Sequence, residues 1–134
     1  MPIDHMPTAE TRRALILVVD DEPLVAGLMA DVLVMDGHEV DTAKNGREAL
    51  EKIAARSYDL IVSDLRMPEL DGVGLYRELE RGRPTLLGRF LFVSGTREPL
   101  EYASFLEATH APVLSKPFCL EDLRRFVRRA LPER

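Results

Sequence analysis

The chain has 134 residues, of which 46% are hydrophobic, so it has the length of one domain and can bury a core without a disulfide or a structural metal. Its net charge of −5 at pH 7 argues against non-specific nucleic-acid binding, since proteins that neutralise phosphates carry a basic excess. Cys119 is the single cysteine, and no apolar run approaches the roughly 20 residues that cross a bilayer. We therefore expect a cytoplasmic protein with no membrane segment and no direct contact with nucleic acid.

The domain itself is expected over residues 13–134, because residues 1–12 are polar, contain two prolines and show no hydrophobic period, which predicts a flexible lead. Within the domain, apolar runs alternate with amphipathic patterns. The runs ALILVV at 14–19 and LIV at 60–62 are typical of strands buried on both faces. In chain order, the sequence predicts strands over 14–19, 38–43, 60–64, 90–93 and 111–115, helices over 23–36, 46–54, 72–81, 99–108 and 120–131, and a loop over 82–88.

Two of these helices have apolar stripes of unequal strength. The helix over 23–36 carries apolar residues at a spacing of four, and we expect this stripe to face the core. The helix over 99–108 has the weakest stripe, which predicts a loosely held element. The first stripe comprises Leu24, Leu28 and Val32 with Val25, Met29 and Leu33, and the second comprises Leu100, Ala103, Leu106 and Glu107.

The alternation of strand and helix predicts an α/β fold, in which a parallel sheet carries helices on both faces. In such sheets ligands bind outside the carboxyl ends of the strands. Four of the five predicted strands end there with a polar group: Asp20 and Asp21, Asp64, Ser94 and Lys116. A lone Asp64 would be read as a polar strand terminator, but the repetition makes it a candidate site residue.

These groups suit phosphoryl chemistry. Three clustered carboxylates repel one another and favour a cation, and Mg²⁺ commonly takes one or two carboxylates together with waters and phosphate oxygens. The lysine supplies a second positive charge, and the serine hydroxyl can donate to an anion. Because carboxylates form aspartyl phosphates, one of the three aspartates is the natural acceptor.

Four motifs in this order resemble the bacterial response-regulator receiver domain. They are VVDDE at 18–22, SDLRMPELDG at 63–72, FVSG at 92–95 and LSKPF at 114–118, and the similarity extends along residues 14–131. The resemblance implies a flavodoxin-like, doubly wound parallel sheet of five strands in the order 2-1-3-4-5 with five helices.

The resemblance also implies a role for each matching residue. Asp64 would take a phosphoryl group from the phosphohistidine of a histidine kinase or a phosphotransfer protein. Ser94 would contact that group after transfer, and Lys116 would pair with it. Asp21, Asp64 and the backbone carbonyl of Arg66 would bind Mg²⁺, with Asp20 holding a metal-bound water. The Lys116-Pro117 peptide bond is expected to be cis.

Two positions depart from the pattern of that family. Val113 stands where many members carry a Tyr or Phe whose ring turns inward on activation, so we expect only a partial population shift. The helix that follows Ser94 contains Pro99, Tyr102 and Phe105, a variation that resembles receivers linked to hybrid sensor histidine kinases. The resemblance implies output through a downstream protein that docks on the last two helices.

Two other functions are possible from the sequence. One is a Mg²⁺-dependent phosphatase of the haloacid dehalogenase type, although its nucleophile would lie after the first strand in an Asp-x-Asp motif. The other is a docking module that is never phosphorylated. We expect no enzyme activity beyond self-catalysed phosphoryl transfer and slow autodephosphorylation.

The remaining reactive or charged residues are expected to be structural or solvent-exposed. Arg66 and Thr96 are expected to flank the site and to influence the phosphoryl lifetime. Cys119 is expected to be a small, partly buried residue near a helix start. The histidines His5, His38 and His110 are expected at the surface, and Arg124, Arg125, Arg128 and Arg129 form either a solvated helix face or a dock for an acidic partner.

Overall fold

The structure, a computed structural model, describes residues 13–95 and 100–131, except for the side chains of residues 100 and 101. The expected lead segment 1–12, together with His5, Thr96 and Pro99, therefore lies outside the described residues. The described part forms a five-stranded parallel sheet in the order β2-β1-β3-β4-β5, which confirms the predicted fold class and strand order.

The observed elements follow the predicted alternation closely. The 3-10 helix η3 takes up residues 84–88 of the predicted loop, so that prediction was wrong for the segment after Arg83. The strands are β1 (Leu15–Val19), β2 (Glu39–Ala43), β3 (Leu60–Asp64), β4 (Phe90–Ser94) and β5 (Val113–Ser115). The helices are α1 (Pro23–Met35), α2 (Gly46–Ala55), α3 (Gly72–Gly82), η3 (Pro84–Arg89), α4 (Leu100–Thr109) and α5 (Leu120–Ala130).

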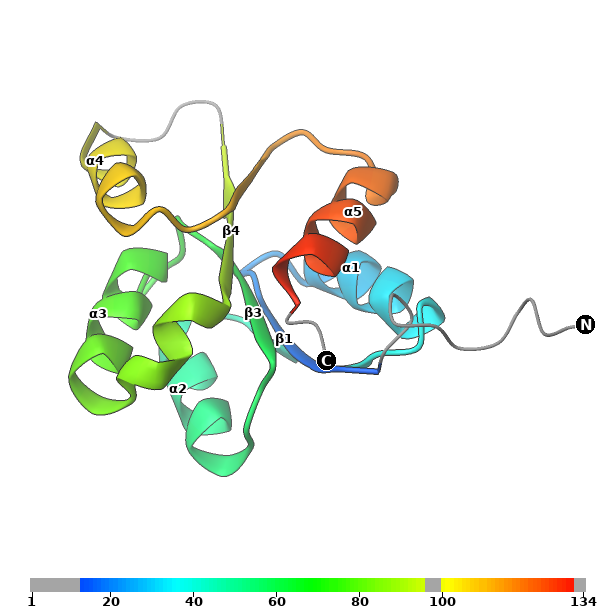
Figure 1. The fold of residues 1–134 in the computed structure, drawn as a ribbon, viewed down its shortest axis with the longest axis horizontal. Coiled ribbons are helices and arrows are strands. Elements are labelled where there is room, and N and C mark those ends of the chain that lie inside the picture. The colour runs from blue at the N-terminus through cyan, green and yellow to red at the C-terminus, as the bar shows by residue number, and fades with distance from the viewer. Residues whose placement is uncertain (1–12, 96–99, 132–134) are drawn as a thin grey trace, which may run out of the picture.

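The helices cover both faces of the sheet. Figure 1 shows α1 and α5 on one side, and α2, α3 and α4 on the other. Alternate residues of each central strand point to opposite faces, so Ile16 and Val18 pack toward α1 and α5, whereas Leu17 and Val19 join the core under α2 and α3. Both cores are apolar, which explains why these strands read as continuous aliphatic runs.

Strand β3 lies at the centre of the sheet. It pairs with β1 on one side and β4 on the other, and all five of its residues are buried. Its last residue, Asp64, is in register with Val93, the residue before Ser94. The sheet therefore holds Asp64 on a strand that is paired on both sides, and it brings the end of β4 beside Asp64.

The inner face of α1 differs from the predicted stripe. The buried residues are Ala26, Met29, Val32 and Leu33. Leu24 is 88% exposed and Leu28 is 52% exposed, so the prediction was wrong for these two. Because α1 is apolar nearly all round, its sequence could not indicate which side faces the sheet.

The predicted inner face of α4 is wrong at Ala103 and Glu107, whereas Leu106 packs against the core as expected and the side chain of Leu100 lies outside the described residues. Phe105 is its buried residue, with Tyr102, Leu106 and Thr109 half-buried at helical spacing, whereas Ala103 and Glu107 are exposed. The ring of Phe105 lies 5.1 Å from that of Tyr76 and 5.5 Å from that of Phe92. An aromatic cluster rather than an aliphatic stripe thus anchors this helix.

Two further expectations fail outside the site. His38 is buried, and its Nδ1 accepts a hydrogen bond of 3.1 Å from the Ala14 backbone N–H, while His110 is exposed as expected. Cys119 is exposed at the N-cap of α5 rather than partly buried.

Among the arginines of α5, Arg124 binds Asp36 at the end of α1 through Nε at 3.2 Å and a terminal nitrogen at 3.0 Å, so it joins two helices.

Candidate functional site

Three carboxylates meet at the carboxyl edge of the sheet. Asp20 and Asp21 follow β1, and Asp64 ends β3. Each offers one oxygen, and these oxygens all lie within 4.8 Å of one another. Asp20 and Asp64 are buried while Asp21 is exposed, so the cluster is open to solvent on the side of Asp21.

Lys116 joins this cluster from the end of β5. Its Nζ lies 3.1 Å from Asp64 Oδ2, to which it donates a hydrogen bond, and 4.0 Å from Asp20 Oδ2. The backbone N–H of Lys116 donates to the carbonyl of Ser94 at 2.8 Å. The following bond, Lys116-Pro117, is cis as expected.

Burial and mutual repulsion shift the pKa values of these groups. Burial raises the pKa of Asp64 to about 6, although Lys116 opposes the shift. Burial also raises the pKa of Asp20, against the hydrogen bond from the Glu22 backbone N–H and the charge of Lys116. Burial acts to lower the pKa of Lys116, but the attraction of Asp64 and Asp20 outweighs it, and the pKa is raised. The site thus holds more negative charge than its lysine can neutralise.

The donor set fits a hard cation. Within the described part of the chain, Asp20 Oδ2 is a buried side-chain oxygen that lacks a hydrogen-bond partner. A buried charged oxygen without a partner is destabilising, and a divalent cation bound by carboxylates removes that penalty. Asp20, Asp21 and Asp64 are therefore the residues that could hold a metal.

Ser94 and Arg66 lie around this cluster. Ser94 is half-exposed at the end of β4, and its hydroxyl donates to the Gly95 carbonyl at 3.3 Å. Arg66 is exposed in the loop that follows β3. The structure thus brings Asp20, Asp21, Asp64 and Lys116 together and places Ser94 on the neighbouring strand end.

The loop between Asp64 and α3 is tightly fixed. The N–H of Gly72 donates to the Leu65 carbonyl at 2.9 Å, and the N–H of Gly46, in the first turn of α2, donates to the Leu70 carbonyl at 2.9 Å. A Cβ atom at Gly72 would lie 2.5 Å from the Asp64 carbonyl oxygen. Gly72 is therefore required by close backbone approach to Asp64.

Sequence reasoning missed one hydrogen bond beside the site, between Tyr102 of α4 and Asp71, the N-cap of α3. The Tyr102 hydroxyl donates to Asp71 Oδ2 at 2.7 Å. In the sequence, Asp71 stands out only as part of the motif at 63–72. No local pattern links residues 31 positions apart, although the position of Tyr102 one turn before Phe105 could have indicated an inward-facing side chain.

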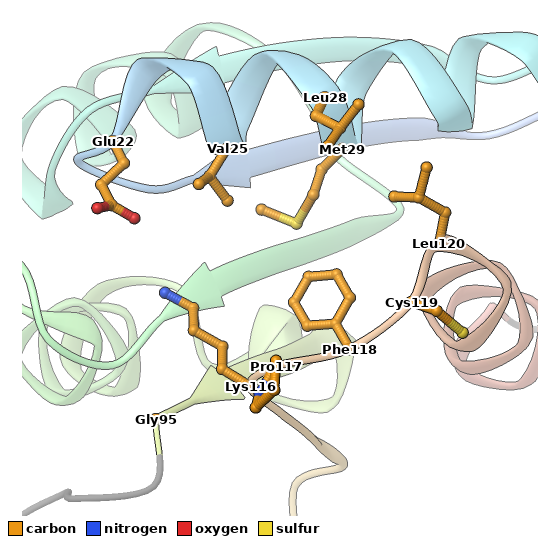
Figure 2. Close-up of a pocket in the computed structure, with 10 residues that line it drawn as sticks. All are labelled: Glu22, Val25, Leu28, Met29, Gly95, Lys116, Pro117, Phe118, Cys119 and Leu120. Atoms are coloured by element: carbon orange, nitrogen blue, oxygen red, sulfur yellow. The ribbon is translucent and has the colours of Figure 1, made fainter.

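An apolar groove adjoins the acidic cluster. It has a volume of about 600 Å³ and lies between α1 and the segment from β5 to α5. Figure 2 shows Leu28 and Met29 of α1 on one wall and Phe118 and Leu120 on the other, with Lys116 at one end. Lys116 lines the groove and also contacts Asp64, so an occupant of the groove would lie beside Asp64.

Comparison with known proteins gives the family. Residues 16–128 match the response regulator receiver domain family. The chain belongs to this family. Receiver domains are the phosphoacceptor modules of two-component signalling, and neither the phosphatase nor the unphosphorylated docking module is supported.

Curated relatives and solved structures agree on the receiver assignment. The response regulator MprA of Mycolicibacterium vanbaalenii is 36% identical over 122 residues, which cover 88% of this chain and 52% of that protein. The chemotaxis protein CheY4 of Vibrio cholerae has a TM-score of 0.79 at 30% identity, covering 90% of this chain and 100% of that one. A signal receiver domain of a histidine kinase from Syntrophus aciditrophicus has a TM-score of 0.77 at 32% identity, covering 88% and 89%.

The chain spans about half the length of the curated response regulator MprA that it matches. A protein-glutamate methylesterase of Archaeoglobus fulgidus is 44% identical over 89 residues, but these make up only 26% of that protein. Receiver domains generally act in signalling rather than as enzymes. The link to a hybrid sensor kinase is not shown by these matches. No helix in the described residues is long and apolar enough to cross a membrane.

Proposed function

We propose that Asp64 is the phosphoacceptor of this receiver domain. The observation that supports it is the position of this carboxylate at the end of the central strand, with Lys116 Nζ 3.1 Å from its Oδ2 and two more carboxylates within 4.8 Å. Asp64 is buried at the end of β3, but its carboxylate lies in the acidic cluster. A phosphoryl group can therefore reach it from the solvent-exposed side, where Asp21 lies.

The transfer needs positioning more than covalent chemistry. An oxygen of the ionised Asp64 attacks the phosphorus of a phosphohistidine. The P–N bond breaks, its electron pair returns to the imidazole, and Asp64 becomes an acyl phosphate. Lys116 must then exchange its hydrogen bond with Asp64 Oδ2 for one with a phosphoryl oxygen.

Mg²⁺ is the cation that we assign to the cluster; when bound, it neutralises charge on the phosphoryl oxygens. Asp21 and Asp64 would hold it directly with the backbone carbonyl of Arg66, and Asp20 would hold one of its waters. Asp20 Oδ2, which has no hydrogen-bond partner among the described residues, supports this assignment. The carboxylates keep the cation site next to the acceptor oxygen.

After transfer, Ser94 and Lys116 would follow the new charge of roughly −1.5 to −2 on Asp64. The Ser94 hydroxyl now faces the Gly95 carbonyl, so it would have to rotate to donate to a phosphoryl oxygen. Val113 is half-buried at the start of β5 and has no aromatic ring that could turn inward when Ser94 rotates. We therefore propose a partial population shift, read by a downstream protein at the surface of α4 and α5.

The phosphoryl donor would be a histidine kinase or a phosphotransfer protein, and we propose that a helix of this donor docks in the groove between α1 and α5. Lys116 and Glu22 form one end of the groove, so the docked helix would place its phosphohistidine at the acidic cluster. Leu24 and Leu28, exposed at a spacing of four, offer apolar anchors for that helix. A cytoplasmic location suits this partner and the exposed thiol of Cys119.

Incubation with acetyl phosphate and Mg²⁺, followed by intact mass, tests the acceptor. The native chain should gain one labile phosphoryl group, whereas Asp64→Asn should gain none. The control is Asp31→Asn, which removes an exposed carboxylate of α1 outside the cluster and should gain the group as the native chain does. A gain by Asp64→Asn, or a gain by the native chain without any divalent cation, would contradict the proposal.

A further inference from the structure

Asp71 uses its two carboxylate oxygens for two different elements. Its Oδ1 accepts from the Gly74 backbone N–H at 2.8 Å and so caps α3. Its Oδ2 accepts from the Tyr102 hydroxyl of α4 at 2.7 Å. Both side chains are half-buried, and the short distance is typical of a hydroxyl that donates to an ionised carboxylate. One residue therefore joins α4 to the start of α3.

On the side of Asp71, this bond reaches the backbone of the phosphoacceptor. The next residue, Gly72, lies so close to Asp64 that a Cβ atom there would be 2.5 Å from the Asp64 carbonyl oxygen. The Gly72 N–H also donates to the Leu65 carbonyl at 2.9 Å. Because this hydrogen bond and the close backbone approach tie Gly72 to residues 64 and 65, a displacement of Asp71 is passed on to the segment that carries Asp64.

On the side of Tyr102, the bond reaches the strand that carries Ser94. Phe105, one turn further along α4, packs its ring 5.5 Å from that of Phe92, two residues before Ser94 in β4. Phe105 is also buried against Tyr76 of α3. The position of α4 is therefore set jointly by β4 and by the bond to Asp71.

The bond is present in a conformation in which Asp64 has not reacted. Lys116 donates to Asp64 Oδ2, and the Ser94 hydroxyl is turned to the Gly95 carbonyl. If phosphorylation turns Ser94 toward Asp64, the end of β4 and the helix that packs on it must adjust. The hydrogen bond between Tyr102 and Asp71 opposes that adjustment, because it ties α4 to the loop that follows Asp64.

We propose that the hydrogen bond between Tyr102 and Asp71 is a latch that stabilises the unphosphorylated conformation of α4. This inference rests on the proposed role of Asp64 as phosphoacceptor. Since coupling between two sites is reciprocal, a bond that resists the phosphorylated conformation must also weaken the binding of a phosphoryl group or its mimic at Asp64. Residues 71 and 102 are positioning residues, because neither contacts the reacting atoms.

The test measures the affinity for beryllofluoride, a phosphoryl mimic, in the presence of Mg²⁺. Tyr102→Phe removes the hydroxyl and keeps the ring. Asp71→Ser keeps an oxygen that can cap α3 and removes the acceptor of the Tyr102 hydroxyl. The matched control is Tyr58→Phe: Tyr58 lies just before β3, away from the acidic cluster, and donates a similar hydrogen bond of 2.6 Å to Asp41 of β2.

Each latch variant should bind beryllofluoride about three- to tenfold more tightly than the native chain, since a half-buried hydrogen bond to a charged group is weakened by solvent screening. The double variant should gain no more than either single variant, and Tyr58→Phe should not change the affinity. Amide hydrogen exchange gives a second readout. The ratio of α4 exchange rates with and without the mimic should move toward one in the latch variants, whereas a merely structural loss would raise both rates and leave the ratio unchanged.

Unchanged or weaker binding by Tyr102→Phe and Asp71→Ser would overturn the latch, as would additive gains in the double variant. Acetyl phosphate labelling of the same proteins separates this outcome from failure of the proposed function. If the native chain gains no phosphoryl group at Asp64, the proposed function fails. If all variants are labelled and only the affinity shift is missing, the proposed function stands and the latch does not.

Discussion

Gly72 matters both for the fold of its loop and for the position of the phosphoacceptor Asp64. Its Cα lies against the Asp64 carbonyl, and its N–H closes the loop onto Leu65. The requirement is steric and does not depend on an unusual backbone dihedral. A single methyl group at this position must displace the acceptor strand, the loop or both.

We expect Gly72→Ala to lower the free energy of unfolding by about 1–3 kcal/mol, the usual range for a side chain forced into a filled site. It should also slow labelling of Asp64 by acetyl phosphate, because the added methyl group shifts the acceptor backbone. Gly27→Ala is the matched control, since a Cβ there meets no atom within 4 Å and α1 should gain about 0.5–1 kcal/mol. Urea unfolding and intact mass measure both effects, and equal stability of the two variants would contradict the steric account.

His38 gives a second prediction at this scale, because its neutral imidazole accepts the Ala14 N–H through Nδ1. Burial lowers the pKa of His38 below 6.5, and Asp36 and Asp59 only partly oppose that shift. The unfolded chain therefore binds a proton at a higher pH than the folded chain does. The contribution of His38 to stability is complete above pH 6.5 and is lost as the pH falls through the lower folded pKa.

We expect the native chain to lose stability relative to His38→Asn as the pH is lowered from 7.5 to 5. Asn can accept the same hydrogen bond through Oδ1 but does not titrate. The comparison between the two proteins removes the contribution of Asp64, whose raised pKa of about 6 acts with the opposite sign. Thermal unfolding across this pH range provides the measurement, and parallel profiles would show that His38 does not titrate as described.

At the scale of elements, α1 is exposed along one side in a way that its contacts with the sheet do not explain. Met29 and Leu33 are buried, whereas Leu24, Leu28 and Met35 remain largely in solvent. Leu28 also lines the groove beside Lys116. The exposed side of this helix is therefore available to a partner helix.

Leu28→Glu and Val34→Glu separate docking from a general change in α1. The two side chains are 52% and 53% exposed, but only Leu28 lines the groove. Surface substitutions of this kind change stability by about 0.5 kcal/mol or less. We expect Leu28→Glu to slow transfer from a phosphohistidine donor by about tenfold, the loss expected of one apolar anchor, and Val34→Glu to have little effect.

Labelling by acetyl phosphate serves as the control for both glutamate variants, because this small donor does not need the groove. Its rate should equal that of the native chain. Equal slowing of both donors by Leu28→Glu would mean that the variant damages the acidic cluster itself. An unchanged rate with the protein donor would exclude the groove as its docking site.

At the scale of the whole molecule, much of the fold could be predicted because its causes are local. Continuous aliphatic runs identify strands buried on both faces, and their alternation with helices requires parallel pairing. Parallel strands place their carboxyl ends at one edge, which is why Asp20, Asp64 and Lys116 could be expected together from their positions after strands. The 2-1-3-4-5 strand order, by contrast, came from the resemblance to a family.

The features that could not be predicted depend on which side of an element the fold buries. Helix α1 is apolar nearly all round, so its sequence did not exclude the exposure of Leu24. His38 is buried just before β2, where its Nδ1 accepts from the Ala14 backbone N–H, and no spacing in the sequence indicates this contact. The hydrogen bond between Tyr102 and Asp71 forms only once α4 lies next to the start of α3, so no local pattern in the sequence indicates it.

The distribution of the two cores has a consequence for the order in which the protein can fold during synthesis. The core under α2 and α3 is complete once Phe105 of α4 has been made, whereas the core beneath α1 needs Leu123 and Val127 of α5 to be closed. Before α5 leaves the ribosome, the apolar side chains of Leu91 and Val93 lack part of their cover. The nascent domain therefore reaches its stable state only when α5 emerges and Arg124 meets Asp36, so α5 completes the core that α1 begins.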